Sequence, residues 1–144
     1  MTRGAAIGAV VLAAAVFAGP AAWAQGTADS LSGGVWRNPK NSVHVDIRPC
    51  GDAICGYVVW ASPKAQADAK KGGTDKLIGL QVLRNFTQVK PGSWKGRVYV
   101  PDLNATFSGT ADLMDAGTLK ARGCLFAGIG CKTQLWKKVD SAAD

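Results

Sequence analysis

Short runs in which apolar and polar residues alternate dominate the chain after residue 33. Val43, Val45 and Ile47, for example, alternate with polar neighbours. A period of two predicts a β-strand with one buried face. Gly, Pro, Asp and Asn separate the runs and favour tight turns. The pattern predicts eight strands: Val35–Arg37, Val43–Ile47, Ile54–Trp60, Leu77–Phe86, Trp94–Val100, Ala105–Leu113, Thr118–Leu125 and Lys132–Val139.

Eight short strands joined mainly by tight turns fit an up-and-down antiparallel barrel or a sandwich. A closed barrel removes the exposed edges that a sandwich keeps. An eight-stranded barrel is wide enough to be filled by side chains or to hold one small ligand. The segment Ser62–Gly73 departs from the alternation and is rich in Ala and Lys. It is expected to form a short helix or a long loop.

The first residues have the pattern of a cleavable signal peptide. Arg3 precedes the uncharged run Ala5–Ala18, and the small residues Ala22 and Ala24 fit a cleavage site after Ala24. A membrane-spanning helix needs about 18 or more apolar residues, and this run is shorter. We therefore expect a periplasmic or secreted protein with no membrane span in its mature part. The expected division is signal peptide 1–24, disordered tail 25–33, barrel 34–139 and tail 140–144.

Four cysteines lie in the expected mature chain, at positions 50, 55, 124 and 131. An even number in an oxidising compartment predicts two disulfides, although three pairings are possible. Cys50–Cys55 and Cys124–Cys131 are favoured because each pair brackets a turn-like segment. A zinc site is disfavoured, because zinc-binding cysteines usually occur in tighter pairs.

Four further segments carry a family resemblance, after the Gly34-Val35-Trp36 signature that resembles lipocalin-like barrels. They are Asp75–Leu80, Trp94–Pro101, Leu119–Gly123 and Thr133–Trp136. Their order resembles a bacterial family of exported proteins catalogued as domain of unknown function 2147. The resemblance covers Gly34 to about Lys138 and implies a lipocalin-like barrel, but no reaction. The chain departs from the family pattern in lacking a glycine after Asn104.

The resemblance and the alternation together single out two groups of residues. Four structural signature residues are expected, of which Trp36 closes the barrel floor with Arg122 or a C-terminal Lys stacked on its ring. This group is Gly34, Trp36, Arg122 and Trp136. The candidates for lining a pocket are Trp60, Trp94, Val98 and Phe107. Small residues on inward positions would leave room beside them, namely Gly96, Gly109, Ala111, Ala121 and Gly123.

Residues suited to catalysis are scarce. His44, the single histidine, falls on the polar phase of its strand and is expected to face solvent. Glutamate is absent, and no Gly-x-Ser-x-Gly or phosphate-binding glycine loop occurs. We therefore expect no enzyme, no metal and no cofactor. The formal net charge of +7 comes from scattered lysines and arginines, which favours an anionic envelope component over nucleic acid as a partner.

Two functions follow from these observations. The first is an exported binding protein whose barrel carries a small, largely apolar ligand. The alternative is a structural or interaction protein of the cell envelope, with a barrel filled by its own side chains and a basic surface. Small residues on the inward positions favour the first, and tryptophans occupying that space would favour the second.

Overall fold

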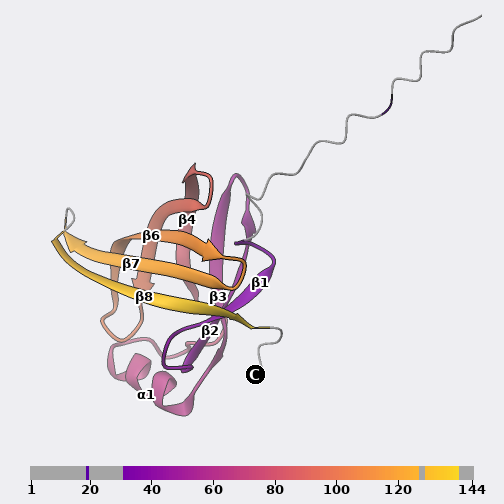
Figure 1. Cartoon of the computed structure of the whole chain (residues 1–144). Helices are drawn as coiled ribbons and strands as arrows, with labels where there is room; N and C mark the ends of the chain where they lie inside the picture. Colours follow the sequence, from indigo (N-terminus) through magenta and orange to yellow (C-terminus); the bar gives the residue numbers. More distant parts are fainter. Residues whose placement is uncertain (1–18, 20–30, 127–128, 140–144) are drawn as a thin grey trace, which may run out of the picture.

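Eight antiparallel strands form a closed barrel in the computed structural model, which describes residues 19, 31–126 and 129–139 (Figure 1). Each strand pairs with the next along the chain, and the first pairs with the last through Val35 opposite Val139. The alternation left an up-and-down antiparallel barrel and a sandwich open, and the eight-stranded barrel is confirmed. Its strands are β1 Gly34–Arg37, β2 Val43–Cys50, β3 Ala53–Ala61, β4 Gln81–Lys90, β5 Ser93–Val100, β6 Ala105–Asp115, β7 Thr118–Phe126 and β8 Ile129–Val139.

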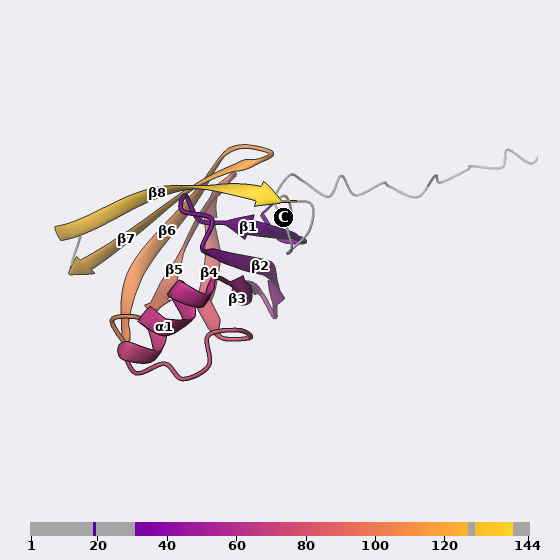
Figure 2. The ribbon, with the colours of Figure 1, turned by 90° about the horizontal axis from the view of Figure 1, so that it is seen from below.

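The segment between β3 and β4 contains a helix, α1 Pro63–Lys71. Ser62 caps it by accepting a hydrogen bond from the Ala65 amide, and the proline at the first turn suits the start of a helix. Ala69 is buried on the face toward the barrel. The helix lies across one end of the barrel (Figure 2), here called the helix end. The sequence left helix and loop open, and the structure has the helix.

Strand β4 begins later than the alternation predicts. The sequence predicts a strand over Leu77–Phe86, whereas β4 runs from Gln81 to Lys90. Residues 77–80 form a turn instead, in which Gly79 has a φ of 88° and the Leu80 amide donates to the Leu77 carbonyl at 3.1 Å. Leu77 is buried in the core, so its apolar side chain packs against the barrel although the residue is not part of a strand.

Trp36, which was predicted to close the barrel floor, is fully buried in the core. Its Nε1 donates to the Leu31 carbonyl at 3.3 Å, and Leu31 is itself buried. Lys138 Nζ lies 5.7 Å from the centre of the Trp36 ring, so the stacked cation is the C-terminal lysine. Arg122 is exposed on β7. The sequence assigned residues 25–33 to a tail, but residues 31–33 pack against the barrel.

His44 is buried, and the expectation that it faces solvent is wrong. Val45 pairs with Val58 and His44 with Trp60, so Val59 is an extra residue that bulges β3. The bulge brings Trp60 to the outer face, where its ring lies 4.6 Å from the imidazole. His44 Nε2 also lies 2.6 Å from Asn41 Oδ1. The indole and the Asn41 side chain thus cover a histidine whose strand position is outward.

Two disulfides tie neighbouring strands together. Cys50–Cys55 joins β2 to β3, and Cys124–Cys131 joins β7 to β8. These are the pairings that the turn-like spacing favours. In the described part of the chain, no helix is both long and apolar enough to cross a membrane. The expected signal peptide and the tail at 140–144 lie outside the described residues, except for Gly19.

Candidate functional site

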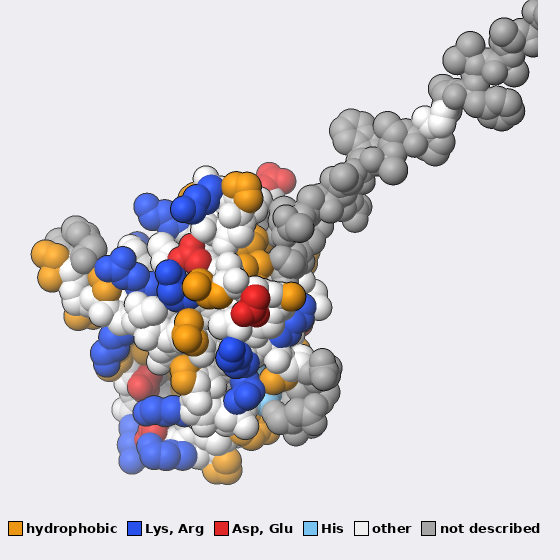
Figure 3. Space-filling view, viewed as in Figure 1, with side chains coloured by type: hydrophobic (Ala, Val, Ile, Leu, Met, Phe, Trp, Pro, Cys, Tyr) orange, Lys and Arg blue, Asp and Glu red, His pale blue; other side chains and the backbone are white. Residues whose placement is uncertain are grey.

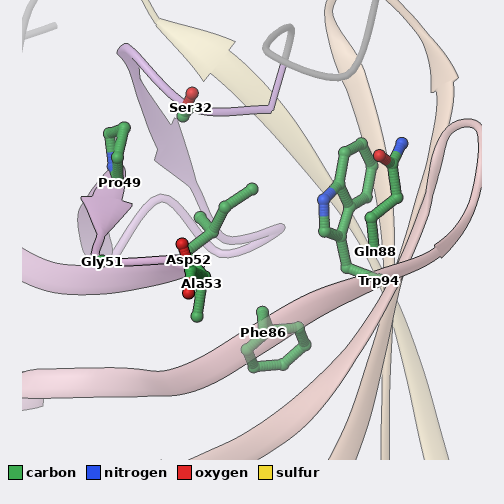
Figure 4. A pocket seen from close by; sticks show the side chains of 9 residues that line it. Ser32, Pro49, Gly51, Asp52, Ala53, Phe86, Gln88 and Trp94 are labelled. Carbon is green, nitrogen blue, oxygen red and sulfur yellow. The ribbon is translucent and has the colours of Figure 1, made fainter.

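A hollow of about 200 Å³ opens at the end of the barrel opposite the helix end. It lies between the β2–β3 hairpin and the strands β4 and β5 (Figure 4). Ser32, two residues before β1, also contributes to the rim. The lining residues are Ser32, Pro49, Gly51, Asp52, Ala53, Ile54, Phe86, Gln88 and Trp94.

The β2–β3 hairpin supplies one wall of the hollow. Gly51 adopts a φ of 66°, a conformation that glycine reaches without steric cost, and this allows the tight turn. The Cys50–Cys55 disulfide closes the loop that contains Gly51, Asp52, Ala53 and Ile54. A cross-link at the base of the turn restricts how far this wall can move. The hollow is therefore partly preformed.

Strands β4 and β5 supply the opposite wall and the floor. Gln88 pairs with Trp94 across these strands, and their side chains lie next to each other (Figure 4). Phe86 and Trp94 are each only 2% exposed, so they belong to the core and present little surface to the hollow. Gln88 is exposed and stands nearer to solvent. Aromatic rings thus form the floor, and an amide marks the rim.

The chemistry of the lining suits a small amphipathic group. Ile54 offers apolar surface above the buried rings of Phe86 and Trp94, while Gln88 and Asp52 offer an amide and a carboxylate. A few polar groups around an apolar floor can orient a ligand that the floor holds by burial. Asp52 is the ionisable side chain in the lining, and a single carboxylate does not provide an acid–base pair.

The middle of the barrel is filled by side chains. A Cβ built at Gly96 would lie 2.5 Å from Cδ2 of the Phe86 ring, and one at Gly109 would lie 2.5 Å from Cγ2 of Val98. Both distances are far below van der Waals contact, so the space above these glycines is occupied. At Gly123 the nearest atom is 4.0 Å from such a Cβ. Phe86 and Val98, rather than the tryptophans, fill the room beside Gly96 and Gly109, whereas the space beside Gly123 is open.

The four pocket candidates from the sequence do not come together. Trp94 lines the hollow. Val98 and Phe107 are paired with each other nearer the helix end, where both are half-buried. Trp60 lies on the outer face beside His44. Ile54, Phe86 and Gln88 were missed, and their strand positions close to the same barrel end are the signal that would have found them.

The signature residues have structural contacts. A Cβ at Gly34 would overlap the end of the Lys138 side chain, so glycine leaves room for this lysine to reach the Trp36 ring. Trp136 packs against the core and its Nε1 donates to Gln134 Oε1 at 3.1 Å. Among the residues that the structure describes, no three His, Cys, Asp or Glu side chains gather in a way that could hold a metal ion.

Comparison with known proteins agrees with this architecture. The family model described as an uncharacterized protein conserved in bacteria (DUF2147) matches residues 34–138. A solved structure titled "Protein HP1028 from the human pathogen Helicobacter pylori belongs to the lipocalin family" superposes with a TM-score of 0.60. The match has 17% identity and covers 76% of this chain and 84% of that chain, so the two share a fold. No curated protein matches the sequence.

Proposed function

The chain belongs to the bacterial DUF2147 family, and from its lipocalin-like barrel we propose that it is an exported binding protein for a small, largely apolar ligand. The ligand, or one end of it, enters the rim hollow and rests on the aromatic floor. The signal peptide directs export, and cleavage after Ala24 leaves the mature protein in the periplasm or the medium. The protein binds and does not catalyse.

The observation that carries the proposal is the hollow itself, with an aromatic floor and a polar rim at an open barrel end. Its volume of about 200 Å³ is smaller than most drug-sized sites, which start at roughly 300 Å³. An apolar cavity of about 150 Å³ is known to take up benzene. A single ring or a short acyl segment therefore suits the hollow, and Gln88 and Asp52 favour a hydroxyl or amide on its exposed end.

The test is a binding titration with p-cresol, which combines one ring with one hydroxyl. Saturation-transfer NMR should detect contact between p-cresol and the mature protein. Ala53→Phe adds a ring to a residue that lines the hollow and should abolish the signal. Val89→Phe adds the same ring to an exposed side chain on β4 and should leave the signal unchanged. Equal binding by both variants would refute a ligand site in the hollow.

Native mass spectrometry of protein purified from the periplasm tests export and cargo together. The proposal expects a chain that begins at Gln25, lighter by the hydrogens lost on forming two disulfides. A companion mass that denaturation releases, and that Ala53→Phe lacks, would identify the ligand class. A full-length chain recovered from the cytoplasm would refute export.

The second candidate is a structural or interaction protein of the cell envelope. The packing of Phe86 and Val98 over Gly96 and Gly109 favours it, because little of the barrel interior is free for a ligand. On this proposal the outer surface, rather than the hollow, makes the functional contact. A protein that binds neither p-cresol nor a copurifying molecule would support this candidate.

A further inference from the structure

Four cations lie together on the outer wall of the barrel, over strands β4 to β7. They are Arg84, Lys95, Arg97 and Arg122, and we call this group the cationic face. They point outward because their neighbours along the strands, such as Trp94 and Val98, pack into the core. Lys95 pairs with Thr110 and Thr110 with Arg122, so one row of neighbours links β5 to β7.

Two of these cations face each other directly, since Arg84 on β4 pairs with Arg97 on β5. Like charges directly opposite each other destabilise a sheet. The Arg84 guanidinium lies 4.8 Å from the centre of the Tyr99 ring, which holds it in place without neutralising it. None of the four cations forms an ion pair within the described ranges. The fold therefore keeps a concentration of positive charge that its own carboxylates do not balance.

The acidic residue that lies closest to the four cations in the strand register already has partners of its own. Asp112, on the same side of β6, accepts a hydrogen bond from the Ser93 hydroxyl and lies 3.9 Å from Lys120 Nζ. Hydroxyl side chains instead separate the cations, with Ser108 opposite Arg97 and Thr110 opposite Lys95. Arginines and hydroxyls are well suited to phosphate oxygens, to which they donate hydrogen bonds.

Exposed apolar side chains border the cationic face on β8. By register, Ile129 and Leu135 point to the same side of the β7–β8 hairpin as Arg122, and they are 73% and 49% exposed. Hydrophobic side chains are visible at the projecting end of this hairpin (Figure 3). Cations beside exposed apolar groups are the combination that binds anionic membrane interfaces, where the apolar groups enter the headgroup region.

We propose that the cationic face docks on an anionic lipid surface, whose headgroup phosphates carry a net negative charge. The four cations are spread over strands β4 to β7 of one wall, which fits an extended anionic surface better than a single small molecule. The cations supply the attraction and the β8 apolar residues the shallow insertion. This inference gives the envelope interaction role a partner of defined chemistry, and it does not depend on the rim hollow.

The experiment is co-sedimentation with vesicles of phosphatidylglycerol and phosphatidylcholine in equal parts, compared with phosphatidylcholine alone. The mature protein should sediment with the anionic vesicles and stay in solution with the neutral ones. The fourfold variant Arg84→Gln/Lys95→Gln/Arg97→Gln/Arg122→Gln should bind more weakly, by about fivefold for each cation removed. Binding that is equal on both vesicle types would overturn the proposal.

A matched control removes the same charge elsewhere. Lys40→Gln/Lys70→Gln/Lys71→Gln/Lys76→Gln changes four exposed lysines at the helix end and should bind anionic vesicles far better than the first variant. Equal losses in the two variants would mean that net charge alone acts, and would overturn a defined face. Ala53→Phe should bind vesicles like the unmodified protein. Its failure to bind would attribute the lipid contact to the hollow and not to the cationic face.

Discussion

Replacing Gly96 by alanine tests whether the barrel interior is filled. The new Cβ would lie 2.5 Å from Phe86 Cδ2 and 2.8 Å from the carbonyl oxygen of Arg84. Carbon atoms pack best at about 3.5–4.0 Å, so the ring would have to retreat by about 1 Å. The Arg84 oxygen belongs to the backbone of β4, which pairs with β5 at this level and cannot yield alone.

Overpacking of this kind costs about 1–3 kcal/mol in the free energy of unfolding. The backbone contact puts Gly96→Ala near the upper end of that range. For a domain of roughly this size, each kcal/mol lowers the melting temperature by about 4 °C, so a fall of about 8–12 °C is expected. Thermal unfolding followed by far-ultraviolet circular dichroism measures it directly.

Gly123→Ala is the matched control, because it makes the same chemical change on an inward position of β7. Its Cβ would meet nothing closer than the Ser108 oxygen at 4.0 Å. Alanine in place of a strand glycine with free space should be neutral or stabilising by up to about 1 kcal/mol. If Gly96→Ala proves as stable as Gly123→Ala, the interior has room above Gly96 and the filled-barrel interpretation is refuted.

Three further changes probe other parts of the structure. Leu31→Ala should lower the free energy of unfolding by about 2–5 kcal/mol in a urea titration, because this buried side chain anchors the segment before β1, and a negligible change would contradict that anchor. Cys50→Ser/Cys55→Ser should lower the free energy of unfolding by about 2 kcal/mol in the same titration. It should also weaken p-cresol binding, since the disulfide supports a wall of the hollow. An unchanged affinity would show that the wall keeps its shape without the disulfide. The backbone N–H of Gly117 and then the Thr118 hydroxyl hold the pKa of Asp115 below its ordinary value of 3.8. The contribution of Asp115 to stability is therefore present above about pH 3.8 and lost as the pH falls through the lower pKa of the folded state. NMR titration of the carboxyl group measures this pKa, and a value at or above 3.8 would refute the prediction.

The sequence predicted the barrel because its signal is repeated in many strands. The alternation over Val43–Ile47 and Ala105–Leu113 identifies these strands even where their ends are misplaced by a residue. The turns between the strands are marked by residues that favour turns. The errors in the prediction fall at irregular positions. Asn85 has a φ of 51°, and the pairings of β4 with β3 and with β5 both shift register around it. A conformation rare for a side-chain-bearing residue cannot be anticipated from periodicity.

The candidate site was harder to predict than the fold, because it depends on single positions. One extra residue, Val59, reverses the side on which Trp60 points, and so removes a predicted pocket residue and covers His44. A shift of one residue moves every following side chain to the other face of the strand, and the local composition does not indicate where such a shift occurs. The hollow likewise needs Gln88 and Ile54 at matching heights on β4 and β3, which only the assembled registers provide.

The packing of the barrel divides its two proposed roles between different surfaces. Phe86 seals the space above Gly96 and, from beneath, forms part of the floor of the hollow. A ligand that enters from the rim therefore meets a closed floor and has to remain near the surface, where Gln88 and Asp52 stand. The outward residues of the same strands are left free to carry charge, as Arg84 and Arg97 do. Binding at the rim and docking through the wall are thus structurally independent, and variants of one should leave the other intact.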